Sequence, residues 1–307
     1  MKRTVLITGC GPGGIGFELA KEFQAKGVSS IHVARHANLI SLDWRGAGLR
    51  VFASARRPEA LAELAAAGLE TVVLDVAQAA SVRAAREHVA SMTGGTLDIL
   101  VNNAGMSYSV PATDVNMDEV HDLFEANLFG VMRMVQEFSP LLIASGDGRI
   151  VNIGSIAGVM PYPFGSAYNA SKAALHAYGN TLRLELAPFN VQVTTILTGG
   201  VKSRIARTPR LIQPSSIYAP IAEHFAKHRA ARSQVGAMPT DAYARTVVAQ
   251  TLRRRVKAWV WTGNFSFVCW FIDTFLGRTG FDWLFSRAFG LTKLKSMILK
   301  DKLKKDV

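Results

Sequence analysis

Residues 4–16 read TVLITGCGPGGIG, and this stretch decides the fold. Thr4 to Thr8 is a short, largely β-branched run, which predicts a buried strand. The glycines that follow allow a tight turn and let the backbone approach a diphosphate. A helix from Phe17 to about Ala25 would add free N–H groups and the positive end of its dipole. A strand, a glycine turn and a helix in this order predict a dinucleotide-binding unit, whereas a glycine cluster alone would indicate only a turn.

The rest of the chain alternates between strands and helices. The expected strands are 49–55, 71–76, 99–102, 149–153 and 191–197, and the expected helices are 58–67, 80–92, 117–142 and 168–187. Strands that alternate with helices of this length predict βαβ units and a parallel sheet covered on both faces. We therefore expect an α/β fold of the Rossmann type, a doubly wound parallel sheet in a single domain (1–255) with a hydrophobic C-terminal appendage (256–307).

One segment interrupts this alternation. Val28 to Gly48, a run of 21 residues, separates the first helix from the second strand. Connections of this type usually have about 2–6 residues. Without the segment, the helix would end at Gly27 and the strand would begin at once at Leu49. We interpret it as an insertion, either a surface loop or an intron retained in the gene model.

Composition favours one sizeable core, since 49% of the 307 residues are hydrophobic and 19% are charged. The net charge of +12 would attract nucleic acid, an anionic membrane or an anionic substrate, or would only solvate the surface. No nucleic-acid-binding motif is present, so no nucleic-acid partner is expected. The two cysteines, Cys10 and Cys269, have neither metal-ligand spacing nor a disulfide pattern, so no metal site is expected. With no signal peptide, they indicate an intracellular, reducing compartment.

Three later strand ends predict contacts to a nucleotide. Asp75, at the end of the third strand, can accept a hydrogen bond from an adenine amino group; the alternative is an aspartate that caps the next helix or is solvated. Residues 102–105 (NNAG) lie at the carboxyl edge of the sheet, where ligands bind in such folds. The second strand ends in SARR (54–57), where an NAD enzyme usually has an acidic residue. A guanidinium pairs well with a 2′-phosphate, so we predict NADP(H), with Arg56 as the main contact and Arg57 next; the alternative is a solvated basic loop.

Residues 168–172 read YNASK, and Ser155 lies thirteen residues before Tyr168. Tyr168 and Lys172 are four residues apart and share one helix face. A lysine ammonium beside the phenol is expected to lower its pKa from the usual ~10, making it a general acid in reduction and a base in oxidation. Ser155 follows the fifth strand and can hydrogen-bond a substrate carbonyl. Such a Tyr/Lys pair alone is usually a surface pair, so this assignment depends on its combination with the glycine turn and NNAG.

These motifs together resemble the short-chain dehydrogenase/reductase family over about Thr4 to Ser203, apart from the insertion. The resemblance implies a carbonyl reductase in which Ser155, Tyr168 and Lys172 form a catalytic triad. It also implies that Asn127 holds a water that connects Lys172 to solvent; the alternative is an asparagine bonded within its own helix. The cofactor contacts that it implies are Gly9, Gly14, Ile15, Gly16, Arg56, Asp75, Asn103, Tyr168, Lys172 and Val201, with Arg133 as a further candidate.

Two departures from the family pattern narrow the resemblance. The turn is one residue longer than the usual TGxxxGIG, and residues 198–201 read TGGV where Pro-Gly is usual. Both features resemble a fungal branch, the NADPH-dependent 1-acyldihydroxyacetone-phosphate reductases. A lipid substrate such as 1-acyl-dihydroxyacetone phosphate is therefore expected. A steroid, retinoid or secondary-metabolite ketone is one alternative, and a non-catalytic lipid-surface protein is another. Analogy with the family also allows a homo-oligomer.

Residues 202–239 lack periodicity and carry four prolines. In such a fold they predict a mobile lid on the substrate side. Their basic side chains are candidates to meet a substrate phosphate, or they solvate the surface. These candidates are Arg204, Arg207, Arg210, Lys227, Arg229 and Arg232.

The C-terminal appendage combines aromatic and basic residues. Ala258 to Leu276 has one acidic residue in 19, but Gly263 and Asp273 interrupt its apolar character. Aromatics followed by lysines predict an interfacial anchor on an anionic membrane or lipid-droplet surface. The alternative is that this segment supplies the last strand, about 258–261, and the wall of a hydrophobic substrate pocket. The expected location is the cytosolic face of the endoplasmic reticulum membrane or of lipid droplets, and otherwise the cytoplasm.

Overall fold

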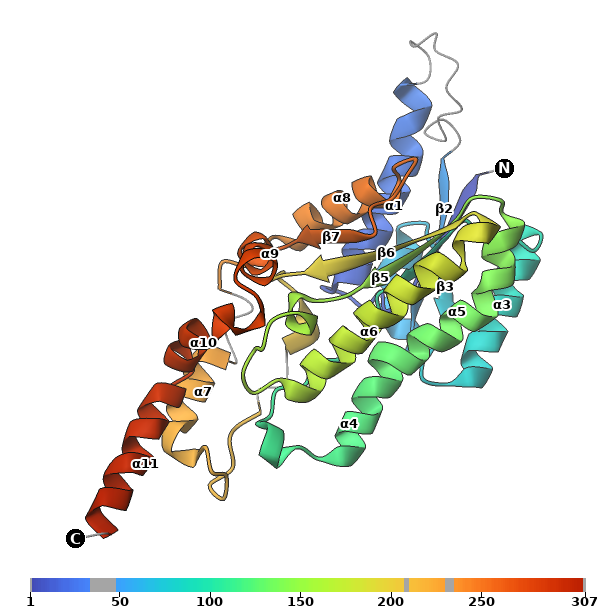
Figure 1. The fold of residues 1–307 in the computed structure, drawn as a ribbon. Coiled ribbons are helices and arrows are strands. Elements are labelled where there is room, and N and C mark those ends of the chain that lie inside the picture. Colours follow the sequence, from blue (N-terminus) through green and yellow to red (C-terminus); the bar gives the residue numbers. More distant parts are fainter. Residues whose placement is uncertain (1, 34–47, 207–209, 230–234, 306–307) are drawn as a thin grey trace.

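The computed structural model describes residues 2–33, 48–206, 210–229 and 235–305. Within these residues, one sheet has the strand order β3-β2-β1-β4-β5-β6-β7, and every strand pair is parallel (Figure 1). The predicted doubly wound parallel sheet is therefore confirmed. The strands are β1 (Arg3–Ile7), β2 (Leu49–Ala55), β3 (Glu70–Val73), β4 (Ile99–Asn102), β5 (Gly148–Ile153), β6 (Val191–Thr198) and β7 (Trp259–Thr262).

The central strands are buried on both faces, as in other parallel sheets covered by helices, and they bury some polar side chains such as Asn152 and Thr195 along with the apolar ones. Every residue of β5 and all but one of β6 are buried. Two apolar clusters, one on each face of the sheet, pack the helices against it. The helices of one face are α1 (Ile15–Val33), α2 (Ala62–Ala66) and α8 (Thr240–Thr251), and those of the other are α3 (Ala79–Thr93), α5 (Gly130–Ala144) and α6 (Ser166–Glu185).

The predicted helix 117–142 is interrupted by a π-helical turn. It consists of α4 (Met117–Phe124), the turn η4 (Glu125–Phe129) and α5. The hydrogen-bond shift in a π turn adds one residue to the turn without ending the helix, so the apolar pattern gave no sign of it. Such turns frequently occur at functional sites, and this one carries Asn127.

The prediction that the first helix ends near Ala25 is wrong. Helix α1 continues to Val33, because the glycine at 27 weakens a helix by only about 1 kcal/mol and does not end it. The first residues of the predicted insertion are therefore helical, and residues 34–47 lie outside the described part of the chain. Strand β2 still pairs with β1 along its length, with Leu6 opposite Phe52, so the insertion leaves the sheet in register.

The C-terminal region begins inside the sheet. β7 pairs with β6, so the part outside the sheet starts after Thr262 rather than at residue 256. The stretch 258–276 divides into β7, a glycine turn and α9 (Ser266–Phe275), followed by α10 (Asp282–Ala288) and α11 (Leu291–Lys305). None of the helices in the described residues is both long and apolar enough to cross a bilayer. Instead, α9 and α10 pack with α7 (Ala222–Arg229) in a third apolar cluster, and α11 runs away from the sheet (Figure 1).

Candidate active site

A cavity of about 1620 Å³ lies at the carboxyl edge of the sheet, where the strand order reverses between β1 and β4. This reversal point is where open α/β sheets bind their ligands. Most of the side chains predicted as site residues line the cavity, whereas Asn127 and Gly16 lie behind its wall. The predicted residues on the wall are Gly9, Gly14, Ile15, Arg56, Arg57, Asp75, Asn103, Arg133, Ser155, Tyr168, Lys172 and Val201.

The glycine turn packs tightly against the residues that follow β4, Asn103 and Ala104. A Cβ on Gly9, whose φ is +75°, would lie 2.8 Å from Cα of Ala104. A Cβ on Gly16 would lie 2.5 Å from Nδ2 of Asn103, so the absence of a side chain at Gly16 allows α1 to begin directly against the turn. No atom would meet a Cβ on Gly11 within 4 Å, so the turn is open toward the cavity.

Asn103 holds this turn in place. Its Nδ2 donates to the backbone carbonyls of Thr8 (2.8 Å) and Gly9 (3.1 Å). The Thr8 hydroxyl in turn accepts from the backbone N–H of Asn103 and of Ala104, both at 3.0 Å. The end of β4 is thus bonded directly to the end of β1, which fixes the rim of the cavity at the reversal point.

Asp75 both lines the cavity and caps the turn after β3. Its Oδ1 accepts from the backbone N–H of Ala77 at 3.0 Å, and its own N–H donates to Ser81 Oγ at 3.0 Å. Asp75 therefore remains placed to contact an adenine, whereas the alternative of a helix cap is wrong, because the N-cap of α3 is Gln78 and the helix has no side-chain cap.

Five arginines line the cavity, and their charges are compensated unequally. Arg133 pairs with Glu125 at 2.7 Å, and Arg210 pairs with Glu119 at 2.6 Å. The other three, Arg56, Arg57 and Arg204, form no ion pair with any residue that the structure describes. An excess of positive charge therefore remains at the end of β2 and beside the glycine turn, where an anionic ligand is favoured.

Helix α6 presents Tyr168 in its first turn and Lys172 one turn later, and both line the cavity. The Lys172 side chain is buried, and its Nζ donates to the backbone carbonyl of Ile153 at 3.0 Å. Burial lowers the pKa of Lys172 to about 8. The ammonium therefore remains the main form at neutral pH, fixed at the end of β5.

Ser155 follows β5 on the same wall. Its Oγ accepts from the backbone N–H of Ala157 at 3.1 Å, so its own hydroxyl proton is directed elsewhere. Its backbone N–H donates to Nε2 of His176 at 3.3 Å.

His176 is a buried residue that the sequence analysis missed. Burial, and secondarily the charge of Lys172, lowers the pKa of the imidazole to about 4. The ring is therefore neutral, and its Nδ1 has no hydrogen-bond partner within the described structure. Tyr168, Lys172 and His176 follow one another at intervals of four along α6. This spacing places them on one helix face and is the signal in the sequence from which His176 could have been found.

Asn127 connects three elements. Its Oδ1 accepts from the backbone N–H of Met106 (2.8 Å), and its Nδ2 donates to Met106 O and Ser171 Oγ, both at 3.0 Å. The alternative of an asparagine bonded within its own helix is therefore wrong. A Cβ on Gly105 would lie 2.9 Å from Asn127 Oδ1 and 3.7 Å from Lys172 Nζ, so both polar groups reach the same glycine.

The other end of the cavity has an apolar wall from the C-terminal region. Tyr162 packs edge-on against Phe285, with ring centroids 5.6 Å apart. Further apolar side chains complete this wall, and they are Met160, Phe225, Phe265 and Leu284. The predicted alternative, in which the C-terminal segment supplies a strand and a pocket wall, therefore describes part of its role.

The basic candidates of the lid region differ in position. Arg204 and Arg210 line the cavity, and Arg210 also lies over the Tyr108 ring at 4.9 Å. Arg207 and Arg232 lie outside the described residues, as do the side chains of Lys227 and Arg229.

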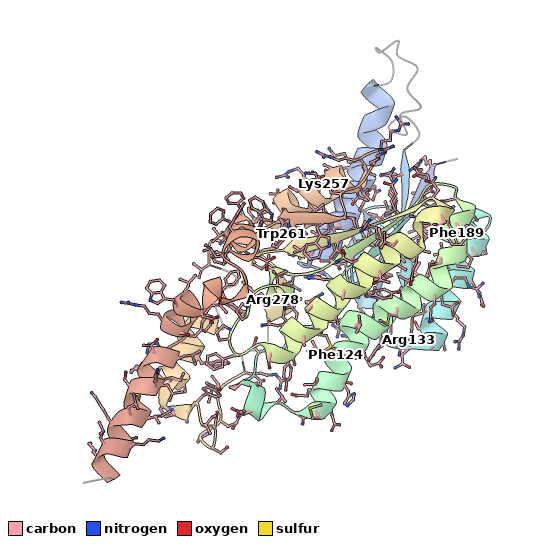
Figure 2. All side chains as sticks on the ribbon, in the orientation of Figure 1. Phe124, Arg133, Phe189, Lys257, Trp261 and Arg278 are labelled. Carbon is pink, nitrogen blue, oxygen red and sulfur yellow. The ribbon has the colours of Figure 1, made fainter. Side chains whose placement is uncertain are left out.

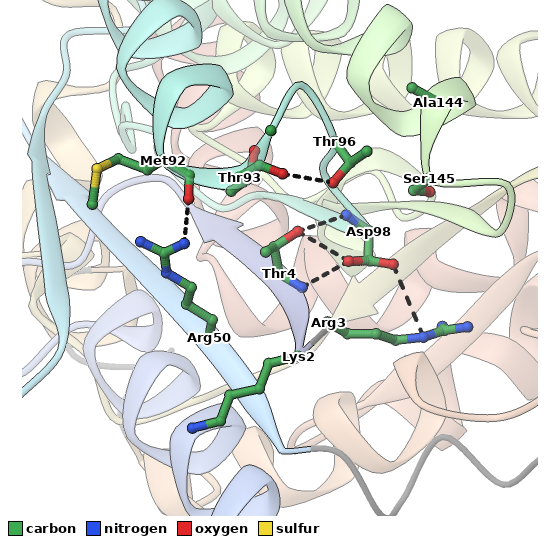
Figure 3. A pocket seen from close by; sticks show the side chains of 11 residues that line it. Lys2, Arg3, Thr4, Arg50, Met92, Thr93, Thr96, Asp98, Ala144 and Ser145 are labelled. Atoms are coloured by element: carbon green, nitrogen blue, oxygen red, sulfur yellow. Dashed lines mark hydrogen bonds and ion pairs between the residues drawn. The ribbon is translucent and has the colours of Figure 1, made fainter.

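A second, smaller cavity of about 440 Å³ lies at the opposite, amino-terminal edge of the sheet (Figure 3). Both of its arginines are compensated, since Arg50 pairs with Glu70 at 2.5 Å and Arg3 pairs with Asp147 at 2.6 Å, so among the described residues Lys2 is the one lining cation without an ion pair. The Asp98 carboxylate accepts from the backbone N–H of Thr4 at 2.7 Å. The surplus positive charge thus lies at the carboxyl edge, where the glycine turn, Tyr168 and Lys172 are.

A doubly wound sheet with this cavity defines a dinucleotide-binding protein of the Rossmann class. Comparison with known proteins gives the family. The family model described as short chain dehydrogenase matches residues 39–211, and the chain belongs to the short-chain dehydrogenase family. It is therefore an oxidoreductase with a fold that binds nicotinamide cofactors.

Similar proteins agree with this assignment. A short-chain dehydrogenase of Pyricularia oryzae is 41% identical over 297 residues, covering 95% of this chain and 96% of the relative. The NADPH-dependent 1-acyldihydroxyacetone phosphate reductase of Schizosaccharomyces pombe is 42% identical, over 71% of this chain and 69% of the relative. The solved structure of a Streptomyces avermitilis short-chain dehydrogenase shares the fold, with a TM-score of 0.71, 24% identity and coverage of 88% and 90%.

Proposed function

We propose that the protein is an NADPH-dependent reductase of a ketone on a lipid or similarly apolar molecule. The observation that carries this proposal is the shared cavity of Ser155, Tyr168 and the buried Lys172 with the glycine turn. A hydrogen-bond donor, a proton donor and a fixed positive charge are the groups that a carbonyl reduction needs beside a bound dinucleotide.

The residues at the dinucleotide end fit NADP(H). The turn is open in front of Gly11, and Arg56 and Arg57, which pair with no carboxylate of the described residues, follow the end of β2. A guanidinium there complements a ribose 2′-phosphate, which NAD lacks. When bound, the cofactor supplies the hydride.

The chain's own residues supply the proton and the electrostatic stabilisation. The Ser155 hydroxyl donates a hydrogen bond to the substrate carbonyl oxygen and keeps its proton, because its own oxygen already accepts from the Ala157 N–H. As the carbonyl carbon gains the hydride, Tyr168 transfers its phenolic proton to that oxygen and gives an alcohol. The Lys172 ammonium, held by the Ile153 carbonyl, stabilises the phenolate left behind, which solvent reprotonates by way of the Lys172 and Asn127 region.

The apolar wall supports an apolar substrate. Phe285, Leu284 and Phe225 face the cavity at the end away from the glycine turn. The Schizosaccharomyces pombe relative, named as a 1-acyldihydroxyacetone phosphate reductase, supports an acyl ketone with a phosphate. A steroid, retinoid or secondary-metabolite ketone suits the same wall and is the second candidate, since Arg210 is already paired with Glu119.

Attachment to the cytosolic surface of the endoplasmic reticulum or of lipid droplets is part of this proposal. Its support is the exposed aromatic face of α9, with Phe267 and Phe275 on it, together with the lysines that α11 carries further along the chain. A lipid surface at this position would adjoin the apolar end of the cavity, to which α10 contributes Leu284 and Phe285.

The test is NADPH consumption by the full chain against 1-acyl-dihydroxyacetone phosphate, its unphosphorylated analogue, a steroid ketone and retinal. Replacing Tyr168→Phe should lower kcat by about 10²–10⁴-fold, because the proton donor is lost, while the Kd for NADPH stays the same. An unchanged kcat in the variant would exclude Tyr168 as the donor. NADPH binding without turnover of any of these ketones would exclude the substrate classes proposed here.

A further inference from the structure

Arg204 reaches from the segment after β6 to the glycine turn after β1. A Cβ built on Gly13 would lie 2.8 Å from Nε of Arg204, 3.3 Å from its Cδ and 3.5 Å from its Cγ. Gly13 has a φ of +66° and lies in the open turn between β1 and α1. The arginine side chain therefore lies directly against the part of the chain that would hold a diphosphate.

No carboxylate among the described residues compensates the charge of Arg204. Arg204 is exposed and forms no ion pair with any described residue. It lies next to the amino-terminal end of α1, a helix of 19 residues whose first turn carries partial positive charge. A cation at the positive end of a helix is unfavourable unless an anion lies between the two.

The backbone that carries Arg204 is tethered to the cavity rim. Ser107 Oγ, after β4, donates to the carbonyl of Ile205 at 2.6 Å. On the other side, the backbone N–H of Lys202 donates to the carbonyl of Met238 at 3.0 Å. The segment 202–205 is therefore held across the mouth of the dinucleotide end of the cavity, with Arg204 directed to the turn.

We propose that Arg204 binds the diphosphate of the dinucleotide from the side opposite the glycine turn. The anion would then lie between the guanidinium and the first amides of α1, and it would satisfy both. This inference rests on the proposed function, because it assigns the same dinucleotide site. It makes Arg204 a contact common to NADPH and NADH, whereas Arg56 is a contact only to the 2′-phosphate.

The experiment measures Kd by calorimetry for NADPH, NADH and ADP-ribose with the full chain. Four proteins are compared: the wild type, Arg204→Gln, Arg56→Gln and Arg245→Gln. Removing a charge-assisted pair to a phosphate should weaken all three ligands by about tenfold or more in Arg204→Gln. Arg56→Gln should weaken NADPH alone. Arg245→Gln is the control, because that side chain pairs with Asp241 on α8 and does not line the cavity, and its affinities should stay unchanged.

The outcomes separate this inference from the proposed function. Unchanged affinities in Arg204→Gln, or a loss for NADPH alone, overturn the diphosphate contact. Equal wild-type affinity for NADPH and NADH overturns the NADP preference and leaves the Arg204 comparison valid with NADH. A wild type that binds none of the three overturns both. Thermal unfolding of each variant in the absence of ligand verifies that it is folded.

Discussion

At the scale of single residues, His176 links the buried lysine to the serine of the site. Its neutral Nε2 accepts the backbone N–H of Ser155, and a Cβ on Gly154 would lie 2.5 Å from that same nitrogen. A protonated imidazole could not accept this bond and would place a second positive charge near Lys172. The site therefore requires His176 in its neutral form.

Because His176 must stay neutral in the folded chain, the free energy of unfolding is expected to decrease at acidic pH. The pKa of His176 is about 4 in the folded chain, against an ordinary value of about 6.5 when unfolded. Between these values the unfolded chain takes up a proton that the folded chain does not, so stability falls as the pH falls from about 6.5 toward 4. The expected loss in the free energy of unfolding is about 2–3 kcal/mol.

Urea unfolding at pH 7, 5.5 and 4.5 checks this prediction, with His176→Gln as the comparison. A glutamine can accept from Ser155 but does not titrate, so the variant should show a flatter dependence on pH. The same dependence in both proteins would show that other groups cause it.

Sequence patterns located Ser155, Tyr168 and Lys172 in the site, but they did not show which arginines are ion-paired. YNASK fixes two of these residues on one helix face, and the strand before Ser155 brings it to the same edge. Arg204 and Arg210 are alike in sequence, yet only Arg210 has Glu119 beside it. That partner lies 91 residues away along the chain, and no local pattern reports such a contact.

At the scale of elements, the residues that follow β6 form backbone hydrogen bonds to two later segments, around Met238 and Asn264. Gly200 bonds to Asn264 in both directions, each at 2.9 Å, and accepts from the backbone N–H of Met238 at 3.0 Å. A Cβ on Gly199 would lie 2.1 Å from the carbonyl oxygen of Asn264. The first glycine of the TGGV sequence therefore has a steric reason, because the turn that follows β7, at Gly263 and Asn264, packs directly against Gly199.

Gly199→Ala should consequently destabilise the protein by about 1–3 kcal/mol, because the added methyl group forces two backbones apart. Gly11→Ala is the control, since its Cβ would meet no atom within 4 Å and its stability should change by less than about 0.5 kcal/mol. Denaturant midpoints of the two variants give the comparison. Equal midpoints would mean that the contact between Gly199 and Asn264 accommodates a methyl group without loss of stability.

Elements with strong patterns were predicted closely. The bounds of β2 and β4 agree with the sequence prediction, because both are apolar runs that end at turn residues. The π turn at 125–129 and the continuation of α1 to Val33 were not predicted. Both depend on hydrogen bonding that leaves the pattern of apolar residues unchanged.

At the scale of the whole molecule, the C-terminal helices have two different faces. Their inner side forms the apolar wall of the cavity, and Figure 2 shows ring side chains along the outer side of α9. The exposed apolar residues of this outer face are Phe267, Val268, Phe271, Phe275, Leu276 and Trp283. The sequence indicated aromatic and basic residues but could not assign them to faces, since inner and outer rings alternate along the same helices.

This outer face should bind vesicles that contain anionic lipid. Phe271→Asp should lower the fraction of the full chain that sediments with such vesicles by severalfold, because it places a charge among exposed rings. Leu184→Asp on α6 is the matched control, since Leu184 is 64% exposed but lies away from the C-terminal helices. Equal sedimentation of the two variants would contradict attachment through α9.

The positions of the end of α1 and the start of β2 have a practical consequence. Helix α1 ends, and β2 begins, at the amino-terminal edge of the sheet, while the glycine turn, Ser155 and Tyr168 lie at the other edge (Figure 1). A reporter or an affinity handle spliced into the chain at this junction would therefore be separated from the chemistry by the length of the strands. The junction is therefore a suitable place to attach the protein to a support, because the cavity lies at the opposite edge of the sheet.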